Sequence, residues 1–223
     1  MNGEGLVYRP PPSAQEPLLP EGVPVVAVEG PIGVGKTTLA RRLGEALEAE
    51  VVLEVVEENP FLSRFYEDIR AVAFQTQIFF LLSRFRQQEA VRQARARGVP
   101  VVTDYIFAKD RLFARLTLDP QEMDLYDRVY AALAPRAVTP SLVVYLRASL
   151  PTLLERIARR GRPFERALQP AYLARLCQAY DEFFDSYGDA PVLQVDTDRV
   201  DIFSDADLRA ILAYVARGTP RVE

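Results

Sequence analysis

The sequence of 223 residues contains no histidine and no tryptophan, and Cys177 is its only cysteine. Without histidine, the chain has no imidazole to act as a general base and no Cys/His set to bind zinc. A single cysteine cannot build the disulfide framework of a small secreted domain. No stretch approaches the roughly 18 consecutive apolar residues of a membrane span. We therefore expect a cytoplasmic protein that does not bind membranes.

Lysine is also scarce, since it occurs only at Lys36 and Lys109, and arginine carries most of the positive charge. Lys and Arg together number 27 against 31 Asp and Glu, which gives a formal net charge of −4. Because no overall basic field exists to attract a polyanion, we expect no nucleic-acid partner. Apolar residues make up 49% of the chain, which is ample for a buried core.

Prolines cluster near the start of the chain, at positions 10, 11, 12, 17 and 20. A segment of this kind continues neither a helix nor a central strand, so we interpret residues 1–23 as a flexible proline-rich tail. No internal repeat or linker interrupts the remainder. Residues 24–223 are therefore expected to form a single domain.

After this tail, short β-branched runs alternate with longer segments of helical period, which is the pattern of βαβ units on a parallel sheet. Strands are predicted over residues 25–28, 51–56, 99–103, 142–146 and 192–195. Helices are predicted over residues 36–49, 71–97, 119–133, 150–160, 170–187 and 205–215. The sequence thus predicts an α/β domain with parallel strands flanked by helices, in which ligands bind beyond the carboxyl ends of the strands.

A phosphate-binding motif follows the first predicted strand, where residues 30–38 fit the P-loop pattern GxxxxGK[ST]. Glycines let backbone N–H groups approach phosphate oxygens at the start of a helix. Lys36 then supplies a charge for the β- and γ-phosphates, and the Thr37 hydroxyl is suited to hold Mg²⁺. Residues expected to bind the triphosphate are Gly30, Gly33, Val34, Gly35, Lys36, Thr37 and Thr38. A GTPase NKxD motif is absent, and the length suits a small-molecule kinase.

Acidic residues follow the next two predicted strands. Glu54 and Glu57 stand near the end of the second strand, and either could accept a proton from an attacking hydroxyl group. Asp104 ends the third strand beside the P-loop, where it could hold a metal ion or simply cap a helix.

The long predicted helix carries Gln77 and Arg84 seven residues apart, on one face within an apolar stripe. Buried amide and guanidinium groups need polar partners. Those partners are either the base of a bound nucleotide or nucleoside, or other side chains of the protein, such as Asp110 for Arg84.

Four arginines lie within residues 156–162, at a predicted helix end that runs into a Gly- and Pro-interrupted loop. We interpret residues 159–167 as a lid whose guanidinium groups close over the triphosphate. The alternative is a solvated helix terminus that the helix dipole favours.

Taken together, these motifs resemble the deoxynucleoside kinase family, especially its bacterial deoxyadenosine/deoxyguanosine kinase branch. The similarity runs from residue 25 to about residue 216, and it is carried by the P-loop and by residues 58–66, 76–84 and 159–165. The resemblance implies a P-loop nucleoside/nucleotide kinase fold with a five-stranded parallel sheet, usually in a homodimer. It also implies ATP-dependent, Mg²⁺-assisted phosphorylation of a deoxynucleoside 5′-hydroxyl.

The resemblance further implies roles for individual residues. Glu54 rather than Glu57 would be the general base, and Gln77 would pair with the nucleoside base. Arg84 and Asp110 would read the far edge of that base. The 3′-hydroxyl would contact Tyr66 and Glu165, and the phosphates would contact Arg156, Arg160 and Arg162.

One position departs from the family pattern of an acid, an arginine and a serine after the third strand, because this chain has Asp104-Tyr105-Ile106. The acid for magnesium is retained, the arginine is missing, and Lys109 is our candidate for its charge. We favour deoxyadenosine and deoxyguanosine as substrates, with deoxycytidine as a further possibility. The alternatives are a thymidylate-type monophosphate kinase and, on the strength of Tyr105, a non-catalytic nucleotide-binding module.

Overall fold

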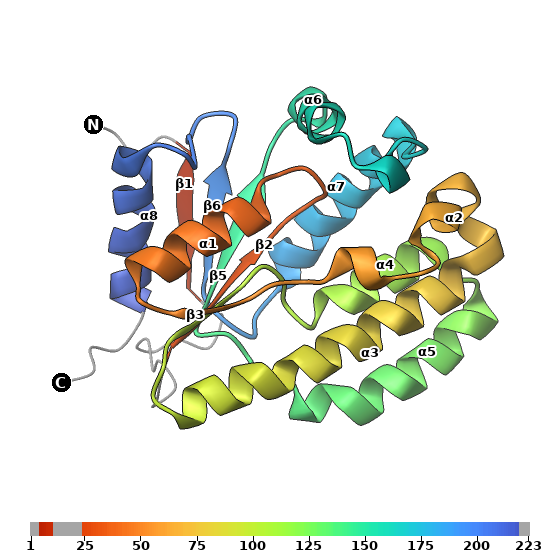
Figure 1. Cartoon of the computed structure of the whole chain (residues 1–223), viewed down its shortest axis with the longest axis horizontal. Coiled ribbons are helices and arrows are strands. Elements are labelled where there is room, and N and C mark those ends of the chain that lie inside the picture. Colours follow the sequence, from red (N-terminus) through yellow and green to blue (C-terminus); the bar gives the residue numbers. More distant parts are fainter. Residues whose placement is uncertain (1–4, 11–23, 219–223) are drawn as a thin grey trace.

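The computed structural model describes residues 5–10 and 24–218, and its centre is a twisted sheet flanked by helices (Figure 1). Within the described residues the sheet has six strands in the order β1-β6-β5-β2-β4-β3. They are β1 (Leu6–Arg9), β2 (Val25–Glu29), β3 (Glu50–Val52), β4 (Val101–Thr103), β5 (Leu142–Arg147) and β6 (Val192–Asp196). Strands β2 to β6 run parallel, and β1 pairs antiparallel with β6 at the edge.

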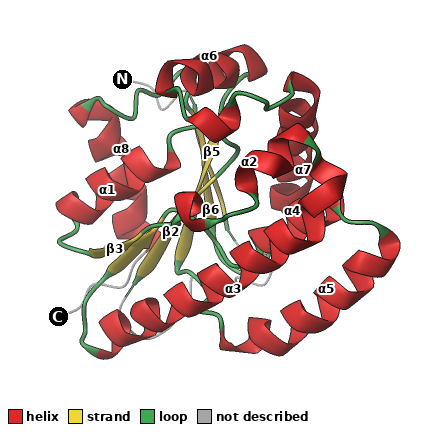
Figure 2. Ribbon diagram, turned by 45° about the vertical axis from the view of Figure 1, so that its right-hand side comes forward, coloured by secondary structure: helices red, strands yellow, loops and turns green. Residues whose placement is uncertain are grey.

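Helices cover both faces of the sheet, as the nearly continuous apolar strands require. They are α1 (Lys36–Ala46), α2 (Leu62–Glu67), α3 (Ile69–Ala96), α4 (Lys109–Thr117), α5 (Pro120–Leu133), α6 (Leu150–Arg160), α7 (Pro170–Ser186) and α8 (Asp205–Gly218). Figures 1 and 2 show α1 and α8 on one side of the sheet and α3, α4, α5 and α7 on the other. No helix in the described part of the chain is long and apolar enough to cross a membrane.

The predicted parallel core of five strands is confirmed, but two expectations need correction. The second predicted strand, 51–56, ends already at Val52, so Glu54 lies in the loop that follows β3. Residues Leu6–Arg9, which were expected in the flexible tail, form the edge strand β1. Four residues so close to a proline cluster carry little strand signal, and they are ordered by backbone pairing with the free edge of β6. The rest of the expected tail lies outside the described residues.

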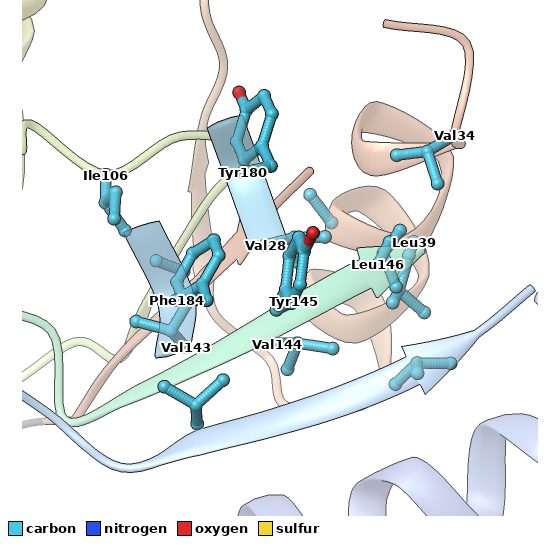
Figure 3. Packing of buried hydrophobic residues seen from close by; sticks show 14 of the residues in the cluster. Val28, Val34, Leu39, Ile106, Val143, Val144, Tyr145, Leu146, Tyr180 and Phe184 are labelled. Carbon is cyan, nitrogen blue, oxygen red and sulfur yellow. The ribbon is translucent and has the colours of Figure 1, made fainter. Parts of the chain in front are cut away.

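The core lies between the sheet and the helices on its two faces. Residues Val28, Val144 and Leu146 of the central strands are fully buried. On one face, the rings of Tyr145 and Phe184 stack with centroids 4.1 Å apart, and Tyr180 lies beside them (Figure 3). These buried strands hold the loops at their carboxyl ends in fixed relative positions.

Helix α1 packs so closely on β3 that Gly44 is needed at their contact. A Cβ atom at Gly44 would lie 2.1 Å from Cγ2 of Val51, far inside van der Waals distance. The small residue therefore sets how near the P-loop helix lies to the strand that precedes Glu54.

We predict that Gly44→Ala destabilises the protein by about 1–2 kcal/mol, because overpacking against Val51 outweighs the helix-propensity gain of up to about 1 kcal/mol. Urea denaturation measures the change. In a Val51→Ala background the same substitution should be neutral or stabilising, since the obstructing methyl groups are gone. A Gly44→Ala protein more stable than the unmodified one would contradict this packing argument.

Candidate active site

A cavity of about 440 Å³ opens at the carboxyl ends of the parallel strands. Its walls come from the P-loop, the β3–α2 connection, α3, α4 and the segment between α6 and α7. Five of the six substrate-binding residues predicted from the sequence line it: Glu54, Tyr66, Gln77, Arg84 and Glu165. Asp110 lies behind Arg84, fully buried.

The P-loop has the left-handed backbone that its glycines predict. Gly30, Gly33 and Gly35 have φ values of +148°, +85° and +106°. A Cβ at Gly30 would approach the Leu146 carbonyl oxygen of β5 to 2.3 Å, so only glycine fits there. Lys36 donates to the carbonyls of Gly30 and Pro31, at 2.7 and 3.1 Å. Burial, together with nearby Lys109, lowers the pKa of Lys36 to about 8.

Thr37 and Asp104 come together at the base of the cavity, as the adjacent strands predict. The Thr37 hydroxyl donates to Asp104 Oδ2 at 2.6 Å, and the Glu54 backbone N–H donates to Oδ1 at 2.7 Å. Asp104 thus ties the P-loop helix to the loop that carries Glu54. This pair of hard oxygen donors fits Mg²⁺, which binds through one or two protein groups while phosphates and waters complete its shell.

The Glu54 carboxylate is held in the cavity by two cationic side chains. Lys109 Nζ lies 3.0 Å from its Oε2, and Arg84 donates to its Oε1. Burial alone would raise the pKa of Glu54, but Arg84 and Lys109 outweigh it and lower the pKa to about 2. The group is therefore ionised throughout the working pH range, whereas Glu57 is exposed at the rim.

Two buried pairs organise the inner end of the cavity. Arg84 forms an ion pair with Asp110, which confirms the partner expected from the sequence, and lies over the Phe80 ring. Gln77 donates to the hydroxyl of Thr117 at 3.2 Å, while that hydroxyl donates to the Phe113 carbonyl. The second N–H of the Gln77 amide and its carbonyl oxygen remain for a ligand.

Tyr66 and Glu165 face the same cavity from α2 and from the segment after α6. Burial raises the pKa of Tyr66 well above its usual value, so the phenol remains a hydrogen-bond donor. Arg160 donates to both Glu165 oxygens, at 2.5 and 3.2 Å. The Tyr66 ring stacks on Phe164, so the middle of the predicted lid packs against α2.

The three predicted lid arginines differ in their surroundings. Arg162 forms an ion pair with Glu57 at 3.0 Å across the cavity mouth. Arg156 lies outside this cavity, where it donates to Thr197 and to the Val34 carbonyl. Arg160 and Gly33 border both this cavity and a second one of about 260 Å³, whose other lining residues are Val34, Gly35, Thr38, Arg156, Arg159, Ile202 and Phe203.

Sequence reasoning missed several residues that line these cavities or contact the residues lining them. Ile202 and Phe203 belong to the connection between β6 and α8, which carries no motif. Thr117 is one of nine threonines in the sequence, and no motif marks it. Glu29 directly follows the predicted strand 25–28 and was given no role, although it is the last residue of β2 and a fully buried carboxylate; a charged residue directly after an apolar run was the available signal.

Tyr105 does not take part in the cavity. Its ring is buried among Val25, Val91 and Val101, and its hydroxyl accepts a hydrogen bond from Gln88 at 3.2 Å. The side chain at the position of the missing arginine is therefore a core residue. Its presence no longer argues for a module without catalysis.

Comparison with known proteins agrees with this fold. The family model for deoxynucleoside kinases matches residues 26–217. A deoxyguanosine kinase of Bacillus subtilis (strain 168) is 39% identical over 198 residues, which cover 86% of this chain and 96% of that protein. The deoxyadenosine/deoxycytidine kinase of the same bacterium is 31% identical, over 81% of this chain and 86% of the relative. The structure of deoxyadenosine kinase from M. mycoides with bound dATP aligns with a TM-score of 0.74 at 26% identity, covering 86% of this chain and 99% of that one.

Proposed function

This chain belongs to the deoxynucleoside kinase family and is a phosphotransferase, and on that premise we propose that it transfers the γ-phosphoryl group of ATP to the 5′-hydroxyl of deoxyadenosine or deoxyguanosine, with deoxycytidine as a weaker substrate. The observation that carries the proposal is the position of Glu54. Its carboxylate lines the same cavity as Lys36 and Thr37 of the P-loop and Gln77 of α3. A nucleoside in that cavity has its base near Gln77 and its 5′ end toward the P-loop.

The base of the nucleoside would bind at the inner end of the cavity. Gln77 offers one N–H and one carbonyl oxygen there, and Arg84 offers N–H groups held in place by Asp110. Tyr66 and Glu165 would hold the 3′-hydroxyl, with the phenol as donor and the carboxylate as acceptor. These contacts leave the 5′-hydroxyl as the group directed toward Glu54.

Glu54 would then accept the proton of the 5′-hydroxyl as this oxygen attacks the γ-phosphorus in line. A carboxylate with a pKa of about 2 is a weak base. Phosphoryl transfer passes through a loose transition state in which the attacking oxygen needs orientation more than early deprotonation, so an ionised and well-fixed carboxylate suffices.

The remaining groups would act on the triphosphate. Lys36 and the lid arginines Arg160 and Arg162 offset the charge of the transferring phosphoryl group, and Arg156 acts from the second cavity. Thr37 and Asp104 would hold Mg²⁺, which when bound neutralises charge on the β- and γ-phosphate oxygens. Lys109, at 3.0 Å from Glu54, would supply the charge of the missing family arginine.

The first experiment offers each deoxynucleoside and each deoxynucleoside monophosphate separately to the protein with ATP and Mg²⁺. We expect turnover of deoxyadenosine and deoxyguanosine, slower turnover of deoxycytidine, and none of the monophosphates. Turnover of monophosphates alone would replace the proposed acceptor by that of a thymidylate-type kinase. A preference for deoxycytidine would overturn the proposed base preference while leaving the reaction intact.

We expect Glu54→Gln to lower kcat about 10²- to 10⁴-fold, the usual effect of losing a general base, while the protein remains folded. Glu57→Gln is the matched control, because it removes the other candidate carboxylate and only loosens the contact with Arg162. Steady-state kinetics on the preferred deoxynucleoside measure both variants. A larger loss in Glu57→Gln than in Glu54→Gln would move the base assignment to Glu57.

We also propose that the protein is a homodimer joined through α3 and α5. These helices lie side by side on the outside of the molecule (Figures 1 and 2), with exposed Leu82 on α3 and Leu125 on α5. Exposed apolar side chains on neighbouring helices favour burial against a second copy.

Sedimentation should give the mass of two chains for the unmodified protein and of one chain for a Leu82→Glu, Leu125→Glu variant. Phe203→Glu is the control, since Phe203 is exposed and apolar but directly precedes α8, which lies on the other side of the sheet from α3 and α5 (Figure 1). A dimer that survives the double substitution would exclude this face.

A further inference from the structure

Glu29, the last residue of β2, is a carboxylate with no exposed surface. Its Oε1 accepts the N–H of Gly30 at 2.8 Å and the hydroxyl of Tyr180 at 2.9 Å. Its Oε2 accepts the N–H of Ile106 at 3.0 Å. One side chain therefore joins the P-loop, the loop after β4 and helix α7.

A buried carboxylate is costly unless a cation compensates its charge. The Nζ atom of Lys109 lies 3.6 Å from Glu29 Oε2 and 3.0 Å from Glu54 Oε2, and the Lys109 side chain is 2% exposed. The ammonium group thus sits between two carboxylates, one beneath the P-loop and one in the substrate cavity. Because both carboxylates attract the ammonium group, the attraction of Glu29 restricts where this group lies relative to Glu54.

Lys109 needs such a restriction. Its ammonium ends a flexible four-carbon stem, and the positive charge of Lys36 is near enough to repel it. Glu29 attracts both lysines and is itself immobilised by two backbone N–H groups and a phenol. It is the rigid member of the set, whereas Glu54 lies in a loop.

We propose that Glu29 is a positioning residue for phosphoryl transfer: it fixes Lys109, and through Lys109 it holds the Glu54 carboxylate at a set place relative to the P-loop. The inference rests on the proposed role of Glu54 as the group that orients the acceptor hydroxyl. Because Glu29 contacts no position open to substrate, its effect is on the geometry of the reacting groups rather than on binding.

The test is Glu29→Gln, which keeps the volume of the side chain. Its amide oxygen can still accept from Gly30 and Tyr180, but its NH₂ group turns two donor hydrogens toward the Ile106 N–H and the Lys109 ammonium. We expect kcat to fall about 10- to 100-fold, the scale of a misplacement of about 1 Å, with KM for ATP and for the deoxynucleoside within about threefold.

Three further proteins separate positioning from a general structural effect. Tyr180→Phe removes one hydrogen bond from the same carboxylate and leaves Lys109 in place, so its kcat should stay within about threefold of the unmodified enzyme. Lys109→Met should lose at least as much kcat as Glu29→Gln, because it removes the ammonium charge as well as its position. The double variant should be no slower than Lys109→Met, because both changes break one chain of contacts. Thermal melting checks that each protein is folded, and Glu29→Asp replaces Glu29→Gln if the latter does not fold.

The outcomes distinguish this inference from the proposed function. If the unmodified protein phosphorylates deoxynucleosides and Glu29→Gln keeps its kcat, Glu29 has no positioning role and the function stands. Losses that multiply in the double variant, or a Tyr180→Phe loss equal to that of Glu29→Gln, also overturn the inference. If the unmodified protein phosphorylates no deoxynucleoside, the proposed function fails and this inference fails with it.

Discussion

Much of the active-site cavity depends on the compensation of buried charge around Glu54. Its carboxylate lies between Lys109 and Arg84, and these cations are shared with Glu29 and Asp110 on either side. Each group alone would be costly to bury, but the alternating charges stabilise one another. Four elements that are distant in sequence therefore meet with little freedom to rearrange: β2, the β3–α2 loop, α3 and α4.

The parallel sheet makes this arrangement possible. The adjacent strands β2, β4 and β3 end at the same edge of the sheet. Glu29, Asp104 and Glu54 therefore lie near one another, although Asp104 comes 75 residues after Glu29 in the sequence. Close packing of α1 on the sheet brings Thr37 to Asp104 at 2.6 Å. The fold thereby brings the P-loop and the side chains proposed to bind a nucleoside to one cavity, which agrees with membership of the deoxynucleoside kinase family.

How far the sequence predicts this site differs from residue to residue. The P-loop was predictable because its glycines, lysine and threonine lie close together in the sequence. A carboxylate partner for Arg84, such as Asp110, was expected because a buried guanidinium group needs a polar partner, and the structure confirms that pair. Tyr105 suggested a non-catalytic module because it replaces an expected arginine, but its side chain packs in the core beside Gln88. Strand β1 was missed because four residues near prolines gain their order only from the edge of β6.

By itself, the sequence determined the alternation of strands and helices, the phosphate-binding motif and the family, because these depend on local patterns and contiguous residues. Only the tertiary structure decided which charges face one another: that Lys109 bridges Glu54 and Glu29, that Arg162 contacts Glu57, and that Thr117 orients Gln77. The physical reason is that such pairs join residues from different elements, and their distances follow from helix and sheet packing that no local pattern records.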